Sequence, residues 1–208
     1  MSSSNVEELI RSTYDEITLL LVPQESERTV CIYIETNYDE SVHGVVGVCV
    51  GDNILIRINP LIKDWEKYVP WVLAHEYNHC IWGYNYFYLK GNRGINLLGS
   101  VISEGIADSF AKIVCPDLEP NWVKSLSRDQ EATQYSIIKD YFHCQDSYNL
   151  HCRFFFGDKK TNTPIGVGYT LGYKIVQNFL KNSETSPKDL IEMDPEILFN
   201  KSGYKSFR

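Results

Sequence analysis

The sequence lacks the run of about 18 apolar residues that a membrane-spanning helix requires, so we expect no membrane partner. It also lacks the basic and then apolar start of a signal peptide, and we therefore expect a cytoplasmic protein. Its 20 Lys and Arg residues are scattered among 27 Asp and Glu residues, and the net charge of −7 argues against nucleic acid as a partner. No linker rich in Pro, Gly or Ser and no internal repeat divides the chain, which predicts one domain over residues 1–208.

Six cysteines are present, but disulfide frameworks are typical of secreted chains shorter than this one. Cys31, Cys49 and Cys80 have apolar neighbours in the sequence. We therefore expect free and mostly buried thiols.

The apolar pattern predicts an α+β fold. Strands rich in β-branched and aromatic residues are expected at 29–34, 45–50 and 54–58, with a tight turn at 51–53. Helices are expected at about 4–21, 69–82, 95–114, 121–142 and 167–180, with short helical turns at 187–192 and 195–200. The segment 143–163 has no clear pattern. A small sheet thus belongs to an N-terminal part of about 1–68, and a helical part covers about 69–208.

The run His75-Glu76-Tyr77-Asn78-His79 matches the H-E-x-x-H pattern within the helix that begins near Pro70 and is expected to stop at Gly83. Residues four apart on a helix differ by about 40° in direction and about 6 Å in height, so both imidazoles can bind one ion. Glu76 lies about 100° round from His75, a place for a general base and not for a ligand. The alternative is a pair of core histidines that bond to the backbone. The apolar residues around them favour the metal, because buried polar groups need partners.

A catalytic zinc site needs a third protein ligand, and Glu104 on the next predicted helix is our candidate. Gly105 and Ala107 are small, and we expect them to let this helix approach the histidine helix closely. Asp108 follows one turn later and could accept the free ring N–H of a histidine. The alternatives are a solvated carboxylate at Glu104 and a surface residue at Asp108.

These motifs resemble those of the gluzincin metallopeptidases, the thermolysin-like group. The closest resemblance is to the uncharacterised bacterial family of predicted zinc-dependent proteases typified by YjaZ. It rests on three runs, which are 73–79 (LAHEYNH), 102–108 (ISEGIAD) and 168–176 (GYTLGYKIV). The resemblance implies a zincin-like α+β fold with the histidine helix at the floor of a cleft. It also implies that His75, His79 and Glu104 are zinc ligands and that Glu76 is the base.

The function predicted from these residues is zinc-dependent hydrolysis, most simply of a peptide or protein substrate. Zinc would activate a water molecule, and Glu76 would move its proton to the leaving amine. For the second donor to the oxyanion we nominate Tyr169 and Tyr173, with His143, His151 and Arg153 as alternatives, although both tyrosines also suit a core.

Two elements are candidates for substrate contacts. Strand 54–58 could lie along the cleft as an edge strand or be a central strand. The aromatic residues at 84–88 could line a pocket or pack under a loop.

Three further hypotheses stay open. The pairs His143-Cys144 and His151-Cys152 could form a second, structural metal site. Cys49 could replace Glu104 in a deformylase-like site. Finally, a catalytically silent protein could use zinc for stability and bind a protein partner in the cleft. The sequence leaves the oligomeric state open.

Overall fold

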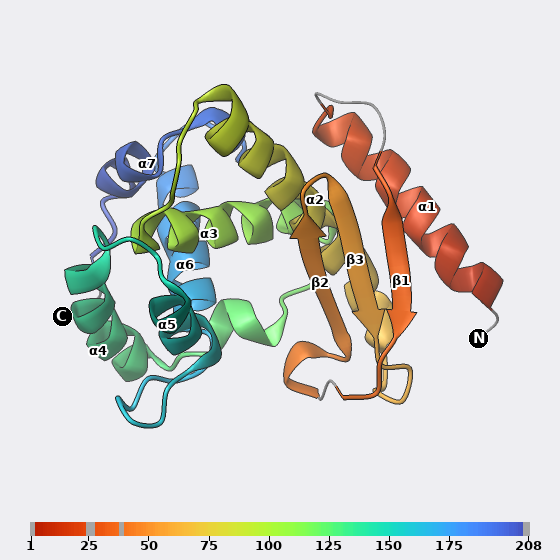
Figure 1. The fold of residues 1–208 in the computed structure, drawn as a ribbon, viewed down its shortest axis with the longest axis horizontal. Coiled ribbons are helices and arrows are strands. Elements are labelled where there is room, and N and C mark those ends of the chain that lie inside the picture. The colour runs from red at the N-terminus through yellow and green to blue at the C-terminus, as the bar shows by residue number, and fades with distance from the viewer. Residues whose placement is uncertain (1–2, 24–27, 38–39, 206–208) are drawn as a thin grey trace.

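The structure is a computed structural model that describes residues 3–23, 28–37 and 40–205. Figure 1 shows a small sheet in the N-terminal half beside a helical C-terminal half, with α3 (Leu97–Val114) between them, which confirms the α+β prediction. Among the described residues, no helix is both long and apolar enough to cross a bilayer.

The sheet has the strand order β1-β3-β2, so β3 is central. Helix α1 (Ser3–Leu20) precedes β1 (Val30–Ile34), which pairs in parallel with β3 (Asn53–Ile58). The antiparallel partner of β3 is β2 (Val45–Val50), joined to it by a two-residue turn. Of the two alternatives left open for strand 54–58, the central strand is therefore correct and the edge strand along the cleft is not. Its isoleucines face the helices and are almost fully buried, and among the described strands β1 and β2 are the two edge strands.

Helix α2 (Val69–Gly83) packs against the inner face of this sheet and against α1 and α3. Nearly every residue of α2 is buried, which explains why its sequence is apolar all round. The α-helix ends at Gly83, the expected stop. The chain continues into a π-helical segment, η3 (Tyr84–Leu89), in which Tyr86 stacks on Trp82 with a ring-centroid distance of 4.6 Å.

The helix expected at 121–142 is broken into shorter pieces. A 3-10 turn, η4 (Asn121–Lys124), is followed by α4 (Arg128–Ile138) and a second turn, η5 (Lys139–Tyr141). The break occurs because a new helix, α4, begins at the N-cap residue Ser127. The Ser127 side chain accepts the backbone N–H of Gln130, whose side chain accepts the Ser127 N–H.

The segment without a clear pattern contains α5 (Tyr148–His151) and a π-helical turn, η6 (Cys152–Phe156). The remaining elements are α6 (Val167–Lys181), η7 (Pro187–Glu192) and α7 (Pro195–Ser202), close to the expected ranges. Two short 3-10 turns, η1 (Glu40–Val42) and η2 (Trp65–Tyr68), lie in the N-terminal half.

Helices α3 and α6 approach each other through two glycines. A Cβ on Gly105 would lie 2.1 Å from the carbonyl oxygen of Gly172, and one on Gly172 would lie 2.1 Å from that of Val101. Gly105 thus lets α3 approach α6 and not the histidine helix, which corrects the expectation above. The histidine helix packs against another side of α3.

All six cysteines are free, as expected. Only Cys80 is fully buried, however, and Cys144 is exposed. The prediction of mostly buried thiols is therefore wrong, because the other four cysteines are only partly buried.

Candidate metal centre

Three side chains from α2 and α3 converge on one point. His75 Nε2 lies 3.0 Å from Glu104 Oε2 and 3.0 Å from His79 Nε2. The third side of this triangle, from His79 Nε2 to Glu104 Oε2, is 3.3 Å. Among the described residues, they are the only group of His, Cys, Asp and Glu side chains arranged to hold a metal ion.

The spacing of these atoms fits a zinc ion. Zinc–nitrogen and zinc–oxygen bonds of about 2.0–2.1 Å in a tetrahedron put neighbouring ligand atoms about 3.3 Å apart. The hydrogen-bond chemistry fits as well. The Nδ1 of His75 is 2.9 Å from the carboxylate of Asp108, so its proton belongs there and Nε2 carries a lone pair. When the His75 ring is neutral, its Nε2 lone pair and the Glu104 oxygen repel each other. A cation held between the three ligand atoms relieves this repulsion.

Without a metal, protons take the place of the cation. Burial opposes charge on His75, but Asp108 and Glu104 outweigh it and raise its pKa well above 6.5. Burial likewise opposes charge on His79, whose pKa is raised by Glu104. For Glu104 burial favours the neutral acid, yet the two histidines lower its pKa far below 4.5. The site is therefore a strongly coupled cluster that prefers positive charge at its centre.

Asp108 contacts His75 on the side of the ring that faces away from the other two ligand atoms. It is completely buried, and its Oδ1 accepts the Nδ1–H of His75. The same oxygen accepts the indole N–H groups of Trp71 at 2.9 Å and Trp122 at 3.1 Å. The surface alternative for Asp108 is therefore wrong. No sequence pattern connects the two tryptophans with the site, since their spacing to Asp108 matches no motif.

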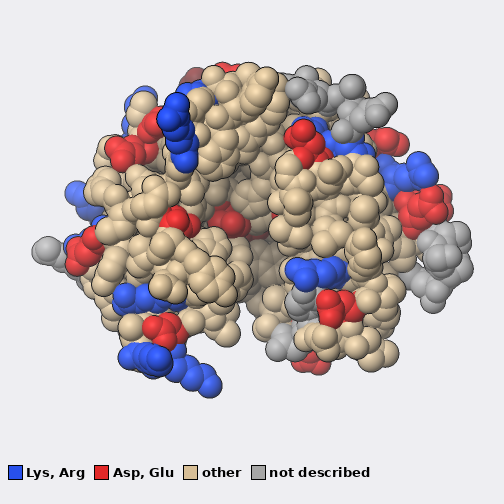
Figure 2. Space-filling model, viewed as in Figure 1, with Lys and Arg blue, Asp and Glu red and all other residues tan. Residues whose placement is uncertain are grey.

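Glu76 lies beside the cluster and under strand β2. It is 8% exposed, and its carboxylate accepts the backbone N–H of Cys49. Burial raises its pKa, although His75, His79 and the Cys49 N–H oppose this effect. A Cβ on Gly47 would lie 2.3 Å from Glu76 Cγ, so only glycine allows β2 to pass this closely. Figure 2 shows the molecular surface hollowed between the two halves, with acidic side chains inside the hollow.

Of the two tyrosines predicted for the site, Tyr169 is the one on which the charges of both Glu104 and Glu76 act. Burial raises its pKa well above 10.0, and the charges of Glu104 and Glu76 raise it further. Tyr173 instead lines a separate cavity of about 540 Å³ with Glu119 and Lys174. Its pKa is raised to about 12, mainly by burial and then by the charges of Glu119 and Asp108.

Among the alternative donors, His151 is affected by the charge of the cluster. Its Nδ1 lies 3.1 Å from Asp146, which raises the pKa of His151, and the charge of Glu104 raises it further. The ring stacks on Phe155, which in turn packs edge-on against Tyr169. Asp146, missed in the sequence, also accepts the hydroxyl of Ser100 at 2.5 Å.

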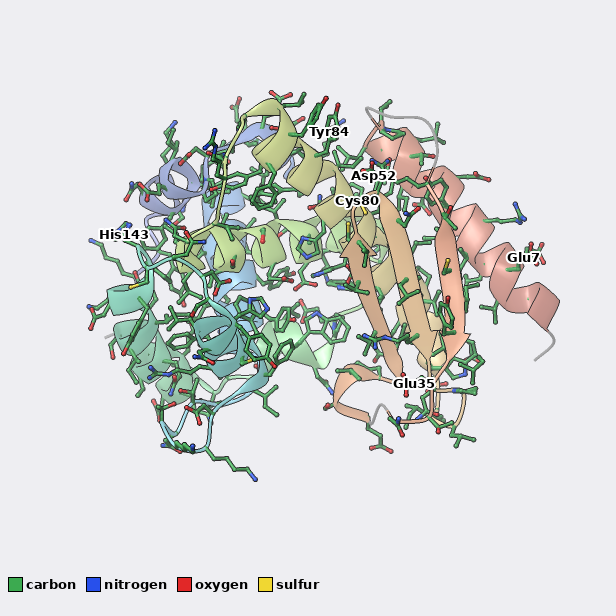
Figure 3. The ribbon with its side chains drawn as sticks, in the orientation of Figure 1. Glu7, Glu35, Asp52, Cys80, Tyr84 and His143 are labelled. Atoms are coloured by element: carbon green, nitrogen blue, oxygen red, sulfur yellow. The ribbon has the colours of Figure 1, made fainter. Side chains whose placement is uncertain are left out.

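The other two alternatives point elsewhere. Arg153 lies over the rings of Tyr141 and Phe154. His143 pairs with Glu196 at 3.3 Å, and Figure 3 shows it at the outer edge of the C-terminal half.

The structure does not support the rival metal sites. Their histidines and cysteines form no convergent group in the part of the chain that is described. His143 and His151 turn to different carboxylates. The thiol of Cys49 donates to the carbonyl of Gly51 at 3.1 Å and is not a member of the convergent group.

The aromatic run at 84–88 is not at the centre either. Its members stack on one another and on Trp82. Figure 3 shows Tyr84 at the far end of α2, away from the hollow.

Comparisons with known proteins agree with this geometry. The chain is similar to the Uncharacterized protein YjfC of Bacillus subtilis (strain 168), with 28% identity in an alignment of 163 residues. That alignment covers 72% of this chain and 52% of the relative, so the chain spans about half the length of the curated relative. No solved structure matches the chain significantly. A family model described as Predicted Zn-dependent protease (DUF2268) matches residues 6–200, almost the whole sequence, and the chain therefore belongs to this family of predicted zinc-dependent proteases.

Proposed function

We propose that the protein is a zinc-dependent peptidase of the gluzincin type, with His75, His79 and Glu104 as ligands and Glu76 as general base. The observation that carries the proposal is the triangle of ligand atoms with sides of 3.0, 3.0 and 3.3 Å. Its third corner is a glutamate from the helix after the H-E-x-x-H helix, which is the arrangement of that subtype. The membership in a family of predicted zinc-dependent proteases supports it.

The chemistry divides between the ion and the side chains. A bound zinc would supply Lewis acidity, which brings the pKa of water from 15.7 toward about 7 and polarises a carbonyl. Glu76 then takes the proton of the attacking water and returns it to the leaving amine. Its buried carboxylate has a raised pKa, which suits a group that must both accept and release a proton near neutral pH. The charge of Glu104 acts on both Tyr169 and His151, which supports our assignment of these two side chains as the donors to the developing oxyanion.

We propose that the substrate is an extended peptide bound along β2. Within the part of the chain that the structure describes, this strand pairs only with β3, so one of its edges has no strand partner in the sheet. The two-residue turn makes Val50 and Asn53 a hydrogen-bonded pair, so the backbone groups of Cys49 and Gly47 point to the free edge. The Cys49 N–H meets the Glu76 carboxylate there. A peptide added at this edge would pass directly beside the base.

Turnover of a library of quenched fluorescent peptides tests the function. We expect a chelator to abolish hydrolysis and zinc to restore it. Glu76→Gln should retain stoichiometric zinc and lose about 10²–10⁴-fold in rate, because a general base contributes that much. Glu8→Gln, at an exposed position of α1, is the matched control.

Two outcomes would contradict the proposal. Full activity of Glu76→Gln would remove the assigned base. Zinc binding without any turnover would instead favour a catalytically silent protein that uses the ion for stability and binds a protein partner.

A further inference from the structure

The buried carboxylate of Asp108 is held in an unusual way. All of its hydrogen bonds go to one oxygen, Oδ1, which accepts N–H groups from Trp71, His75 and Trp122 at 2.9, 2.9 and 3.1 Å. Its other oxygen, Oδ2, is buried and has no hydrogen-bond partner among the described residues. The orientation of the carboxylate therefore depends on these three donors.

The two indoles differ from other donors in a way that matters here. An indole N–H only donates, carries no charge and does not titrate, whereas Arg or Lys would neutralise the carboxylate. Trp71 and Trp122 thus fix Asp108 and leave its full negative charge to act on the imidazole of His75. Trp71 lies one turn before His75 on α2, so both present their N–H groups on the same face.

Trp122 belongs to a separate element, η4, which is held in place by hydrogen bonds. Its carbonyl oxygen accepts the hydroxyl of Thr170 on α6 at 2.8 Å. The preceding backbone N–H, of Asn121, donates to Nε2 of His43 at 3.2 Å, and the ring of His43 stacks on Tyr68. The turn η4 is therefore tied to both halves of the molecule, which sets the position of the indole over Asp108.

We infer that Trp71 and Trp122 are positioning residues of the metal centre. Their indole N–H groups hold Asp108 so that its Oδ1 keeps the His75 proton on Nδ1, and Nε2 then presents its lone pair to the metal. This inference rests on the proposed zinc site and extends it to two residues that touch neither metal nor substrate.

Zinc affinity tests the inference independently of activity. Trp122→Phe and Trp71→Phe keep an aromatic ring and remove the N–H. Titration of the chelator-stripped protein against a chromophoric zinc chelator should show a dissociation constant raised about 10-fold or more in each, the effect typical of lost outer hydrogen bonds. Trp82→Phe is the control, because this tryptophan is buried on the same helix but stacks on Tyr86. Trp122 is less buried than Trp71. If Trp71→Phe does not fold, the zinc affinity of Trp122→Phe therefore tests the inference.

A double-mutant cycle separates positioning from packing. If Trp122 acts through Asp108, then Trp122→Phe should weaken zinc binding much less in an Asp108→Asn background. Equal weakening in both backgrounds would mean that the ring acts through packing alone and would overturn the inference. So would wild-type affinity in Trp122→Phe, and in that case the proposed zinc function would stand.

A second readout uses the metal-free protein. The downfield proton resonance of the His75 Nδ1–H should shift in Trp122→Phe and stay in place in Trp82→Phe. If the wild type bound no zinc, the proposed function would fail. The resonance would still test whether Trp122 positions Asp108. An unchanged resonance in Trp122→Phe overturns the positioning role.

Discussion

Replacing Gly47 by alanine should displace the Glu76 side chain without touching any residue that would hold the metal. The new Cβ would lie 2.3 Å from Glu76 Cγ, 2.8 Å from its Oε1 and 2.8 Å from Val72 Cγ1. Carbon atoms in contact prefer about 3.5–4.0 Å, so strand and side chain must separate by more than about 1 Å. The contact is with the middle of the side chain, which cannot simply swing aside.

The expected loss follows from that displacement. A misplacement of about 1 Å in a reacting group can cost about 10²-fold in rate, and we expect a loss of this order in kcat/KM on a peptide substrate. Overpacking should also lower the free energy of unfolding by about 1–3 kcal/mol. Zinc content should stay stoichiometric, because neither Glu76 nor Val72 is among the converging ligands.

The assay combines peptide hydrolysis, urea denaturation and elemental analysis of one preparation. Gly83→Ala is the matched control, since a Cβ there meets nothing within 4 Å. It should leave hydrolysis unchanged. Wild-type turnover in Gly47→Ala would refute the reasoning, because it would show that the position of Glu76 under β2 does not matter.

Three further predictions concern the metal, the pH and a second buried charge. Glu104→Ala should lose zinc in elemental analysis, and full zinc occupancy would remove Glu104 from the ligand set. Although burial opposes their charge, Glu104 and, for His75, Asp108 raise the pKa of His75 and His79 above 6.5 in the metal-free protein. Their contribution to stability is therefore fully present below pH 6.5 and lost as the pH rises through the raised values. Zinc affinity should change in the opposite sense and fall as the pH decreases, which urea denaturation and zinc titration at several pH values would check. Lys174→Met should lower the free energy of unfolding by about 1–3 kcal/mol, because it removes the cation beside Glu131, whose side chain is 4% exposed, and urea denaturation measures this loss.

The sequence predicted the centre of the site better than its surroundings. The spacing of His75 and His79 fixes their relation as soon as α2 is a helix, and the apolar residues around them make that helix certain to be buried. Glu104 could be proposed from its apolar neighbours. Its distance to the histidines, however, depends on how α3 packs, and the sequence does not encode this in any local pattern.

The errors and the alternatives left open share a physical cause, which is that tertiary contacts decide between local alternatives. Strand 54–58 has the composition of either a central or an edge strand, and only its pairing with both β1 and β2 settles which. Gly105 indicates a close contact between helices, but not with which helix. Its contact on α6, Gly172, is 67 residues further along the chain. The two tryptophans behind Asp108 look like ordinary core residues, because an indole N–H leaves no trace in a sequence pattern.

The predicted helix boundaries were wrong where a local capping signal interrupted the helical spacing of apolar residues. Ser127 begins α4 with a capping box inside a stretch that otherwise continues the apolar spacing. Gly83 ends α2 as expected, but the chain continues beyond it in the wider turns of η3, whose aromatic side chains pack on Trp82.

X-ray absorption at the zinc edge tests the central claim most directly. Zinc-loaded protein should show a shell of nitrogen and oxygen neighbours at about 2.0–2.2 Å, with the outer scattering of two imidazoles. A sulfur neighbour at about 2.3 Å, or a shell without imidazole, would contradict the assignment of His75, His79 and Glu104 as the zinc ligands.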